Sequence, residues 1–520
     1  MLISKQHKKV VLNLRNVERV TTIIPTAKTF EYKGKTLVAV PHRDDETRVL
    51  RNLGFDVPPP ITYYYKYPGK FSPYLHQLDT SGFFTMNPRS FCLNGMGSGK
   101  TLSALWAFDY LRKVGKVKRL LVVAPLSTLE RAWGDEIFSS FEDMTHCVVH
   151  GGKDKRVKLL RTDYDVYIIN HDGIKNSDVI AEINRRGDID IVIIDEIAVF
   201  RNSGTDRWRT MRKLILNVPY VWGLTGTPTP NEPTDAWAQI RLINPKNVHD
   251  SRIRFKDTVM LQKGPYKWIP RENAAETVFR AMQPAIRYSR EECIDLPPTT
   301  YITRHAEMTG EQKTVYKTML DELVAEYEAG QVTAANEAIK ASKLLQIACG
   351  AVYAADGTTI FLPSKPRMEA MLELIEQSES KSIVFVPFTA ALTAVADFLR
   401  EKEYSVGVVS GQTSKGERDR IFSGFQTGVH PRIIVANAAA MAHGLTLTAA
   451  STTIWYAPPP SNEIYEQANV RTVRPGQKHN TLIAHLEGSA IERKAYDRLQ
   501  KKGKMQGLLL DLMVDNRGQF

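Results

Sequence analysis

Cysteines are few in this sequence and long apolar runs are absent, and both facts exclude classes of protein. The four cysteines lie singly in a chain of 520 residues. None belongs to a CxxC pair, so neither a zinc site nor a disulfide framework is supported. No apolar run approaches the roughly 20 residues of a membrane-spanning helix, and the charged N-terminal stretch does not resemble a signal peptide. We therefore expect a protein of a reducing cytoplasm with no membrane partner.

Negative charge is also in short supply relative to positive charge. Lys and Arg number 69 against 57 Asp and Glu, which gives a net charge of +12. This excess favours a polyanionic partner such as nucleic acid, although many basic proteins bind none. A chain of this length is too long for one hydrophobic core, so we expect two or three domains.

The stretch from Asn94 to Thr101 (NGMGSGKT) is the strongest functional signal in the sequence. A short apolar strand at 91–93 runs into it, and a helical pattern at 102–111 leaves it. A glycine-rich turn in this position lets backbone N–H groups converge on an anion beside the positive end of a helix. The lysine and threonine that follow suit β/γ-phosphates and Mg²⁺. We therefore predict that five residues bind a nucleotide, with Thr101 also on the metal: Gly97, Ser98, Gly99, Lys100 and Thr101.

One position of this stretch departs from the strict phosphate-loop pattern. Asn94 lies six residues before Lys100, where that pattern has glycine. The alternative interpretation is a glycine turn followed by a surface lysine that binds no phosphate. The strand before the turn and the helix after it favour nucleotide binding.

A pair of carboxylates, Asp195 and Glu196, directly follows the apolar strand expected at 189–194. Hydrolysis of a nucleoside triphosphate needs one carboxylate on Mg²⁺ and a second group that orients or deprotonates the attacking water. We assign the metal to Asp195 and the water to Glu196. An Asp-Glu pair alone is usually a helix N-terminus or a solvated loop, but its position after a buried strand favours the catalytic interpretation.

A third group consists of Gln467, Arg471 and Arg474, spaced at i, i+4 and i+7. This spacing predicts one face of a helix. Guanidinium groups aimed across a cleft would stabilise charge on a transferring phosphoryl group. The alternative is a salt-bridged helix surface, which we disfavour because we count no acidic partner at the neighbouring turns. We therefore include all three among the predicted catalytic residues, with Lys100, Asp195 and Glu196.

The first 70 residues differ from the rest of the chain. We expect a hairpin at 29–40 that turns at Lys33-Gly34, a short helix at 44–53, and an extended, Pro- and Tyr-rich linker at 57–67. Ten Lys and Arg residues lie between Lys5 and Arg48. This part is therefore either an accessory module that binds duplex or branched DNA, or a solvated cap on the first domain.

The remaining chain alternates apolar strands with helices in two series. Repeated apolar strands with polar, Gly- or Pro-containing ends predict α/β domains, each built on a doubly wound parallel sheet with ligands at the carboxyl ends of the strands. The expected divisions are a first α/β lobe, a helical bridge, a second α/β lobe and a C-terminal helix, at 71–240, 241–375, 376–490 and 491–520.

These blocks resemble, in order, the motifs of superfamily 2 helicase-like ATPases, specifically the SWI/SNF-type translocases of double-stranded DNA. The resemblance covers residues 70–500 and rests on the following segments: Pro73–Gln77, the loop ending in Lys100-Thr101, Pro125-Leu126-Ser127 with Trp133 and Glu136, Asp195–Ala198, Leu224–Pro228 with Asn231, Arg287–Glu291, Ser410–Thr413, Gly444–Leu447 and Gln467–Gln477.

The resemblance implies two RecA-like lobes, with ATP and Mg²⁺ between them and a nucleic-acid backbone crossing both. It also implies that Gln77 reads adenine and that Gly444 belongs to the nucleotide site. Nucleic-acid contacts are implied for Pro125, Ser127, Gly411, Gln412 and Thr413. The bridge lacks the large protrusions of nucleosome remodellers, which favours a translocase of bacterial or phage kind. One departure is Ala198, where the family has His or Asp; it would loosen coupling between the ATP site and the segment after Leu224.

The leading hypothesis is a monomeric, DNA-dependent ATPase that moves on duplex or branched DNA, in remodelling, branch migration or annealing. One alternative is a helicase that unwinds RNA or single strands, against which the Arg-Pro-Gly-Gln ending at 474–477 argues. Another is a nucleotide-dependent clamp that holds nucleic acid without moving. The retained carboxylates and arginines favour turnover over a clamp.

Overall fold

A computed structural model describes residues 1–69, 72–230, 232–264, 268–293, 298–328, 334–354, 356–441, 447–473 and 477–499. The chain divides after Cys293 into two compact units, which are described separately. Within the described residues, no helix is both long and apolar enough to cross a bilayer.

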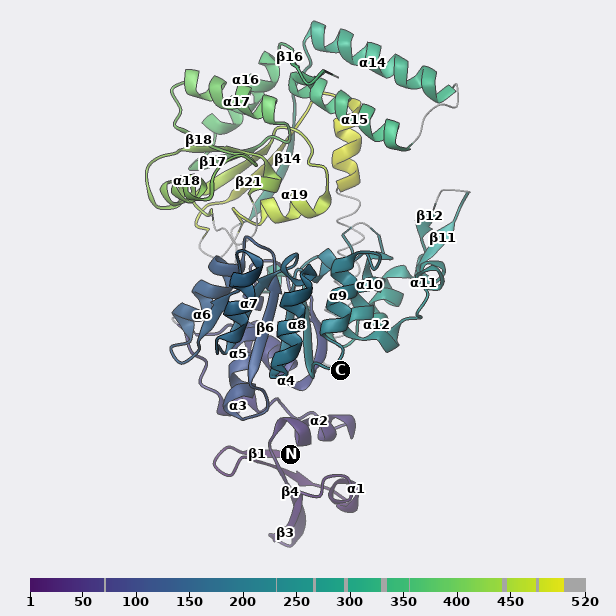
Figure 1. Ribbon diagram of the computed structural model, residues 1–520, viewed down its shortest axis with the longest axis vertical. Helices are drawn as coiled ribbons and strands as arrows, with labels where there is room; N and C mark the ends of the chain where they lie inside the picture. Colours follow the sequence, from purple (N-terminus) through teal and green to yellow (C-terminus); the bar gives the residue numbers. More distant parts are fainter. Residues whose placement is uncertain are drawn as a thin grey trace. The chain divides into compact units, whose positions relative to one another are not determined.

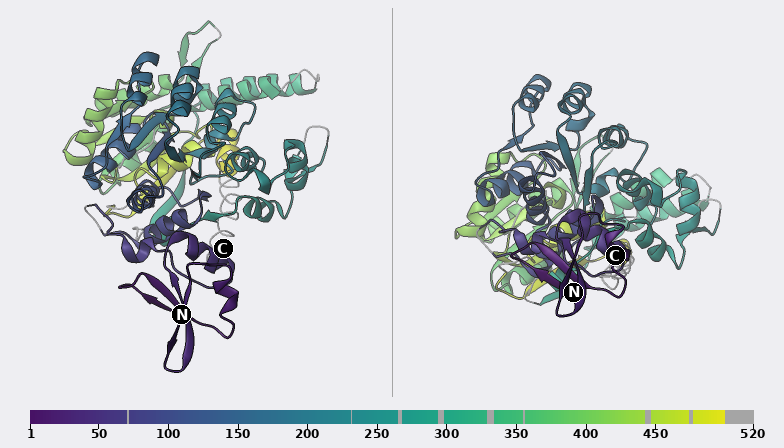
Figure 2. Two further views of the ribbon diagram at one scale, coloured as in Figure 1. Left: turned by 60° about the horizontal axis from the view of Figure 1, so that its bottom comes forward. Right: turned by 90° about the horizontal axis from the view of Figure 1, so that it is seen from below.

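The N-terminal part of the first unit is an antiparallel sheet of four strands in the order β1-β2-β4-β3. Its elements are β1 (Leu2–Ser4), β2 (Lys9–Asn13), α1 (Glu18–Thr21), β3 (Lys28–Tyr32), β4 (Lys35–Pro41) and α2 (Asp44–Asn52). The hairpin turning at Lys33-Gly34 and the helix after it are therefore confirmed. Every residue of β3 is exposed. The β3–β4 hairpin lies at the end of this module that points away from the large sheet (Figures 1 and 2).

The expectation of an extended linker at 57–67 is wrong. Helix α3 (Ile61–Tyr64) lies inside this segment, and Val57 and Ile61 are fully buried. His42 joins the segment to the sheet, since its Nε2–H donates to the Pro58 carbonyl at 2.8 Å and its Nδ1 accepts from the Tyr64 hydroxyl at 2.9 Å. The prolines fix the backbone for a helix start rather than for an open connection.

The large sheet of the first unit has seven strands, all parallel, in the order β13-β5-β10-β9-β6-β8-β7. Its strands are β5 (Arg89–Cys92), β6 (Arg119–Ala124), β7 (His146–Val148), β8 (Val166–Asn170), β9 (Ile189–Asp195), β10 (Tyr220–Leu224) and β13 (Ala285–Ile286). The strands expected from apolar runs are confirmed, whereas the short edge strands β7 and β13 had not been foreseen.

Helices cover both faces of this sheet (Figure 1). The helical elements of the first unit after α3 are α4 (Leu75–Met86), α5 (Lys100–Lys113), η1 (Leu129–Gly134), α6 (Asp135–Ser140), α7 (Lys153–Arg161), η2 (Gly173–Lys175), α8 (Ser177–Arg186), η3 (Ile197–Phe200), α9 (Asp206–Leu214), α10 (Asp235–Ile243), η4 (Pro245–Asn247), α11 (Arg252–Val259), α12 (Ala274–Ala281) and α13 (Arg290–Cys293). A small two-stranded ribbon, β11 (Met260–Gln262) with β12 (Trp268–Pro270), follows α11.

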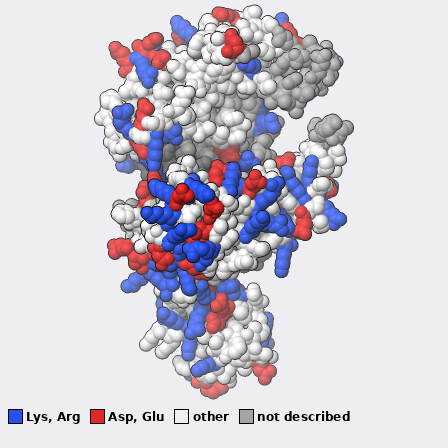
Figure 3. Space-filling view, in the orientation of Figure 1, with Lys and Arg blue, Asp and Glu red and all other residues white. Residues whose placement is uncertain are grey.

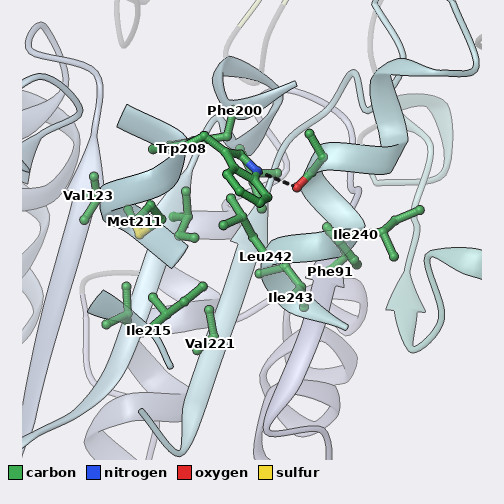
Figure 4. Close-up of a cluster of buried hydrophobic side chains, with 14 of the residues drawn as sticks. Phe91, Val123, Phe200, Trp208, Met211, Ile215, Val221, Ile240, Leu242 and Ile243 are labelled. Carbon is green, nitrogen blue, oxygen red and sulfur yellow. Dashed lines mark hydrogen bonds between the residues drawn. The ribbon is translucent and has the colours of Figure 1, made fainter. Parts of the chain in front are cut away.

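Alternate residues of each central strand enter two separate hydrophobic cores. In β6, Leu121 and Val123 belong to one core, while Leu120, Val122 and Ala124 belong to the other. Figure 4 shows part of the first core, where the indole N–H of a buried tryptophan reaches a backbone carbonyl. A parallel sheet covered on both faces needs such continuous apolar strands, which is why the sequence predicted them well.

The second unit contains a parallel sheet of six strands in the order β14-β21-β20-β17-β19-β18. The strands are β14 (Thr299–His305), β17 (Lys381–Phe385), β18 (Val406–Val409), β19 (Ile433–Ala436), β20 (Ala450–Trp455) and β21 (Thr481–Glu487). The other elements are α14 (Gly310–Glu328), α15 (Ala334–Cys349), β15 (Ala351–Tyr353), β16 (Thr359–Phe361), α16 (Lys365–Glu376), α17 (Thr389–Glu401), α18 (Lys415–Thr427), η5 (Ala438–Ala440) and α19 (Asn462–Asn469). Both doubly wound α/β lobes are thus confirmed.

The segment expected as a helical bridge, 241–375, divides between the two units. Helices α10 to α12 and strand β13 belong to the first unit, while β14 and the helices α14 and α15 belong to the second. Strand β14 pairs with β21 along its whole length. A helix occupies residues 490–499, and the rest of the expected C-terminal helix lies outside the described residues.

A buried ion pair in the second unit leads to a prediction on stability. The Arg367 guanidinium lies 2.7 Å from Glu492, and both side chains are almost completely buried. Arg367→Met should lower the free energy of unfolding of this unit by about 3–5 kcal/mol, because Glu492 would stay buried without its counter-charge. The double variant Arg367→Met/Glu492→Gln should recover most of the loss. Chemical denaturation with hydrogen exchange of the β20 and β21 amides measures both; equal losses in the single and double variants would contradict the prediction.

Candidate active site

Four neighbouring strands of the first unit end at the same edge of the sheet, and each continues into a predicted functional segment. The phosphate loop follows β5, the segment Thr225-Gly226 follows β10, Glu196 follows β9, and Pro125 follows β6. These strands are adjacent in the order β5-β10-β9-β6. Because the strands are parallel, their carboxyl ends meet, and this edge collects ligand-binding loops.

The phosphate loop needs glycine at two positions. Gly97 and Gly99 both have φ of +79°, a left-handed conformation that side chains rarely adopt. A Cβ built on Gly99 would lie 2.1 Å from Nε2 of Gln77, so a side chain there would collide with the preceding helix. These two glycines let the backbone turn tightly into α5, whose N-terminal amides follow directly.

Asn94 replaces the first glycine of the pattern and fixes the start of the loop. Its side-chain amide donates to the Thr80 hydroxyl at 2.8 Å, and its carbonyl oxygen accepts from the backbone N–H of Tyr288 at 2.9 Å. The Gly95 N–H donates in turn to the Tyr288 carbonyl at 2.9 Å. The departure therefore has a structural reason, since Asn94 ties the loop to α4 and to the segment after β13. No pattern in the sequence indicated the Tyr288 contact.

Gln77 and its neighbour His76 lie against the loop. Gln77 Oε1 accepts from the Tyr74 N–H at 3.0 Å, and its Nε2 lies 3.4 Å from the Ser98 carbonyl. The same carbonyl accepts from Nε2 of His76 at 2.9 Å. Burial lowers the pKa of His76, which favours the neutral ring. Sequence reasoning predicted no role for His76; its position directly before Gln77 is the signal that could have indicated one.

The phosphate loop has groups that suit a triphosphate. Ser98 Oγ is buried and, within the described part of the chain, has no hydrogen-bond partner. The Lys100 ammonium donates to the loop carbonyls of Asn94 and Gly95 at 3.0 and 3.1 Å. An anionic ligand could accept hydrogen bonds from the Ser98 hydroxyl and from the Lys100 ammonium. The left-handed conformations of Gly97 and Gly99 also suit a loop that binds an anion. The residues present therefore suit a nucleotide phosphate chain.

Asp195 and Glu196 are held by different partners. Asp195 Oδ2 accepts from the Trp133 indole N–H at 3.0 Å, and its Oδ1 accepts from the Glu196 N–H at 3.1 Å. Glu196 has φ of 49°, an uncommon backbone conformation that concentrates at functional sites. Its Oε2 accepts from the Thr225 hydroxyl at 3.3 Å, which joins the ends of β9 and β10.

The fully buried thiol of Cys92 ends strand β5, just before the phosphate loop. Burial raises the pKa of Cys92, the last residue of β5, to about 11, with Lys100 acting to lower it and Asp195 to raise it. The Lys100 ammonium lies just beyond the end of β5, since it donates to the carbonyls of Asn94 and Gly95. A cation and a carboxylate at one sheet edge are the combination that Mg²⁺-nucleotide chemistry requires.

A magnesium ion would find oxygen ligands of the right kind here. Among the described residues, no group of three or more His, Cys, Asp or Glu could hold a metal alone. Mg²⁺ commonly binds one or two protein oxygens together with substrate phosphates and water, rather than a full protein cage. The Asp195 carboxylate and the Thr101 hydroxyl, in the first turn of α5, supply that limited set.

In the second unit, the predicted nucleic-acid segment follows strand β18. Ser410 N–H donates to the Thr413 hydroxyl at 2.9 Å, and Gln412 N–H donates to the Ser410 hydroxyl at 3.2 Å. Gly411 and Gln412 are exposed on this turn. In the first unit, Pro125 is buried, while Leu126 and Ser127 are exposed. Each segment presents backbone at the carboxyl end of a strand.

The expectation that Gln467, Arg471 and Arg474 share one helical face is wrong for the described residues. Helix α19 ends at Asn469, and Arg471 lies in the following turn, buried, with its carbonyl accepting from the Leu447 N–H at 3.0 Å. Pro475 follows in the sequence, and a proline disfavours the helical conformation of the residue before it. Arg474 and Gly444 lie outside the described residues.

The expectation that Gln467 has no acidic neighbour is also wrong. Glu463 lies one turn before Gln467 on α19, and its Oε1 accepts from the Gln467 side chain at 3.4 Å. An acidic partner is therefore present at the neighbouring turn. Glu463 and Gln467 are both half-buried on α19, and Arg471 follows the end of that helix.

Two family models match the chain. Residues 90–351 match the SNF2-related domain, and residues 366–476 match the helicase conserved C-terminal domain. The first match includes the phosphate loop and the Asp195-Glu196 pair, and the second includes the Gly411–Thr413 turn and the arginine segment.

Curated relatives are similar over about four fifths of the chain. One is the SWI/SNF-related matrix-associated actin-dependent regulator of chromatin subfamily A-like protein 1 of Xenopus laevis, 24% identical over 79% of this chain. The chain spans only 41% of that relative's length. Another is putative protein p41 of Acyrthosiphon pisum secondary endosymbiont phage 1, 24% identical over 81% of this chain and 94% of its own length.

Solved structures are also similar. The Sulfolobus solfataricus SWI2/SNF2 ATPase core in complex with dsDNA is 23% identical, covers 86% of this chain and 94% of its own, and has a TM-score of 0.41.

Proposed function

Since this chain belongs to the SNF2-related family of helicase-like ATPases, we propose that it hydrolyses ATP with Mg²⁺ in response to DNA and moves on duplex or branched DNA. Remodelling, branch migration and annealing are the processes such movement would serve. The phage relative supports a place in the cytoplasm of a bacterium or a phage-infected host, and we propose that the motor acts as a monomer.

The observation that carries this proposal is the meeting of the phosphate loop, Asp195, Glu196 and Thr225 at the ends of adjacent strands. In the proposed reaction the loop amides and Lys100 bind the β/γ-phosphates. Asp195 and Thr101 would hold Mg²⁺, and the ion would supply positive charge that neutralises the phosphates. Glu196 orients the attacking water and accepts its proton, and the Thr225 hydroxyl holds the carboxylate in place.

Arginines of the second unit complete the proposed catalytic set. Arg471 and Arg474 would stabilise negative charge that develops on the transferring phosphoryl group, since a guanidinium offers a fixed fork of donors to phosphate oxygens. Gln77 would read the base, Gln467 would support the arginines, and Gly444 would border the nucleotide. Each of these roles remains a proposal to be tested by substitution.

Phosphate contacts with DNA are proposed at the strand-end turns rather than on the most charged surface. They would involve Pro125, Ser127 and the turn Gly411-Gln412-Thr413, and would carry little sequence information. Figure 3 shows basic side chains interspersed with acidic ones on the face of the first unit that α7 and α8 cover. There Lys153 pairs with Asp178, and Glu182 pairs with two arginines, so much of that positive charge is already compensated.

A comparison of nucleic acids tests the proposal. ATP turnover should rise on adding duplex DNA and should rise less with single-stranded DNA or RNA of equal length. Displacement of a triplex-forming strand should require ATP hydrolysis. Stimulation by RNA alone would favour the unwinding helicase, whereas ATPase activity without ATP-dependent displacement would favour the clamp.

The N-terminal hairpin gives a prediction about DNA structure. Lys33 and Lys35 lie at the exposed tip of β3–β4 beside the half-exposed ring of Tyr32. Reversing both charges, Lys33→Glu/Lys35→Glu, should weaken binding of forked DNA on the order of 10-fold at low salt, because phosphate contacts dominate such affinity. Linear duplex should be affected less. Fluorescence anisotropy with both DNAs measures the difference.

The matched control reverses two exposed lysines of the second unit, Lys402→Glu/Lys494→Glu. It changes net charge equally but leaves the hairpin intact. Equal losses in the two double variants would show that only net charge matters, and the module would then be a solvated cap. Surface substitutions are preferable to deleting residues 1–70, because Tyr65 donates to Asp109 of α5 at 2.6 Å and the module packs on that helix.

A further inference from the structure

The Trp133 indole contacts the carboxylate of Asp195. Trp133 is fully buried, and its N–H donates to Asp195 Oδ2 at 3.0 Å. The second oxygen of Asp195 accepts from the Glu196 N–H at 3.1 Å. Each carboxylate oxygen therefore has a donor in a fixed direction, and the side-chain donor comes from the neighbouring strand's loop rather than from β9.

The backbone that presents Trp133 is an unusual turn. Residues 129–134 form a π-helical turn, a rare geometry that is frequent at functional sites. The Thr128 carbonyl accepts from the N–H of Ala132 at 3.0 Å and from that of Trp133 at 3.2 Å. The Thr128 hydroxyl donates to the Pro125 carbonyl at 2.9 Å. Hydrogen bonds thus connect the strand-end segment 125–128 continuously to Trp133.

A second contact joins the same two strand ends. His171 follows β8, and its N–H donates to the Ala124 carbonyl at the end of β6 at 3.2 Å. Its Nε2 donates to the Asp195 backbone carbonyl at 2.8 Å. The Asp195 backbone is thereby held by one residue while its carboxylate is held by another. A shift of the 125–128 segment would therefore act on the carboxylate through Trp133, while His171 holds the Asp195 backbone carbonyl.

We propose that Trp133 is a positioning residue that sets the orientation of Asp195 toward Mg²⁺ and transmits nucleic-acid contact at segment 125–128 to that carboxylate. The first part concerns only the metal site. The second part rests on the proposed function, because it requires DNA to contact the segment. Hydrogen bonds from groups behind a metal ligand orient it, and their loss typically lowers metal affinity about 10- to 100-fold.

If the Trp133 indole only stabilises the fold, its loss should not change metal binding. Buried indole N–H groups usually find some acceptor. Trp208, in the same unit and almost fully buried, donates to the Ala238 backbone carbonyl at 2.9 Å (Figure 4). Trp133 differs because its acceptor is the carboxylate that ends β9. Trp208→Phe is therefore the matched control for Trp133→Phe, since each variant keeps an aromatic ring and loses one indole hydrogen bond.

The first experiment measures metal binding without turnover. Mn²⁺, used as a paramagnetic substitute for Mg²⁺, is titrated in the presence of ADP and followed by electron paramagnetic resonance. Trp133→Phe should bind Mn²⁺ about 10-fold more weakly than the wild type. Its affinity for ADP, measured after a chelator has removed divalent metal ions, should be unchanged. Trp208→Phe should match the wild type in both. Unchanged Mn²⁺ affinity in Trp133→Phe would overturn the proposal.

A measurement on the unaltered chain covers the case in which Trp133→Phe does not fold. In protein labelled with ¹⁵N-tryptophan, Mn²⁺ with ADP should broaden one indole N–H resonance far more than the others, because only one indole is expected to donate to a metal ligand. Mg²⁺ with ADP should shift the same resonance. If no indole resonance responds, Trp133 does not act on the metal site.

The second experiment tests transmission. At Mg²⁺ concentrations that saturate the variant, Trp133→Phe should lower the ratio of DNA-stimulated to basal kcat about 10-fold, with the Kd for duplex DNA close to wild type. An unchanged ratio would overturn the transmission. Loss of DNA binding together with kcat would indicate a collapsed segment and overturn the transmission. If the wild type shows no stimulation by DNA, the proposed function fails, while the Mn²⁺ result still decides the positioning role.

Discussion

Lys100→Ala should abolish ATP turnover while leaving the fold intact. Removing a single donor that stabilises developing negative charge costs about 10²- to 10³-fold in kcat, so a loss of at least about 100-fold is expected. Lys100 lies in the first turn of α5, half-buried, and its ammonium contacts only loop carbonyls in the described structure. Its removal deprives no buried acid of a partner. Steady-state ATPase assays with saturating duplex DNA measure the effect.

Lys113→Ala is the matched control for this change. Lys113 is the last residue of the same helix, and its partner Asp109 keeps an ion pair with Arg112 at 2.9 Å. The control removes a lysine from α5 without touching the loop, so it should retain wild-type turnover. DNA-stimulated hydrolysis by Lys100→Ala at the level of this control would reject the phosphate loop as the ATP site.

The sequence predicted the parts of the fold that are buried on both sides. Strands such as β6 and β9 are continuous apolar runs because both faces of a covered parallel sheet are hydrophobic, and those runs are visible without a structure. Strand β14 was missed because it lies at the edge of its sheet, and most of its residues are exposed. Strand β13 has only two residues. Neither carries a pattern that periodicity could reveal.

The candidate site shows a similar division. Local patterns placed the phosphate loop and the carboxylate pair, because their chemistry depends on residues adjacent in sequence. The contacts between loops depend on strand order, which local patterns do not specify. Thr225 reaches Glu196 because β10 lies beside β9, and Trp133 reaches Asp195 because β6 lies on the other side. The spacing of Gln467 and Arg471 predicted a shared helical face that the structure does not have, because the helix ends at Asn469, between the two residues.

Glu196→Gln should uncouple nucleotide binding from hydrolysis. The substitution keeps the shape of the side chain and an oxygen that can accept from the Thr225 hydroxyl, but it removes the base that would take a proton from water. General-base catalysis contributes about 10²- to 10⁴-fold, so kcat should fall by at least about 100-fold. The affinity for ATP should stay within a few-fold of wild type. Equilibrium binding of a fluorescent ATP analogue and single-turnover hydrolysis measure the two quantities separately.

Substitutions at Thr225 separate the orientation of Glu196 from its basicity. Thr225→Ser keeps the hydroxyl and should retain most activity, whereas Thr225→Val removes it and should lower kcat with little change in ATP affinity. In the Glu196→Gln background, Thr225→Val should have little further effect on kcat. The amide that replaces the carboxylate cannot take a proton from water, so its orientation no longer matters. Such non-additivity is the mark of two residues acting on one step. If instead the losses multiply, Thr225 acts elsewhere, and the link between the ends of β9 and β10 does not serve catalysis.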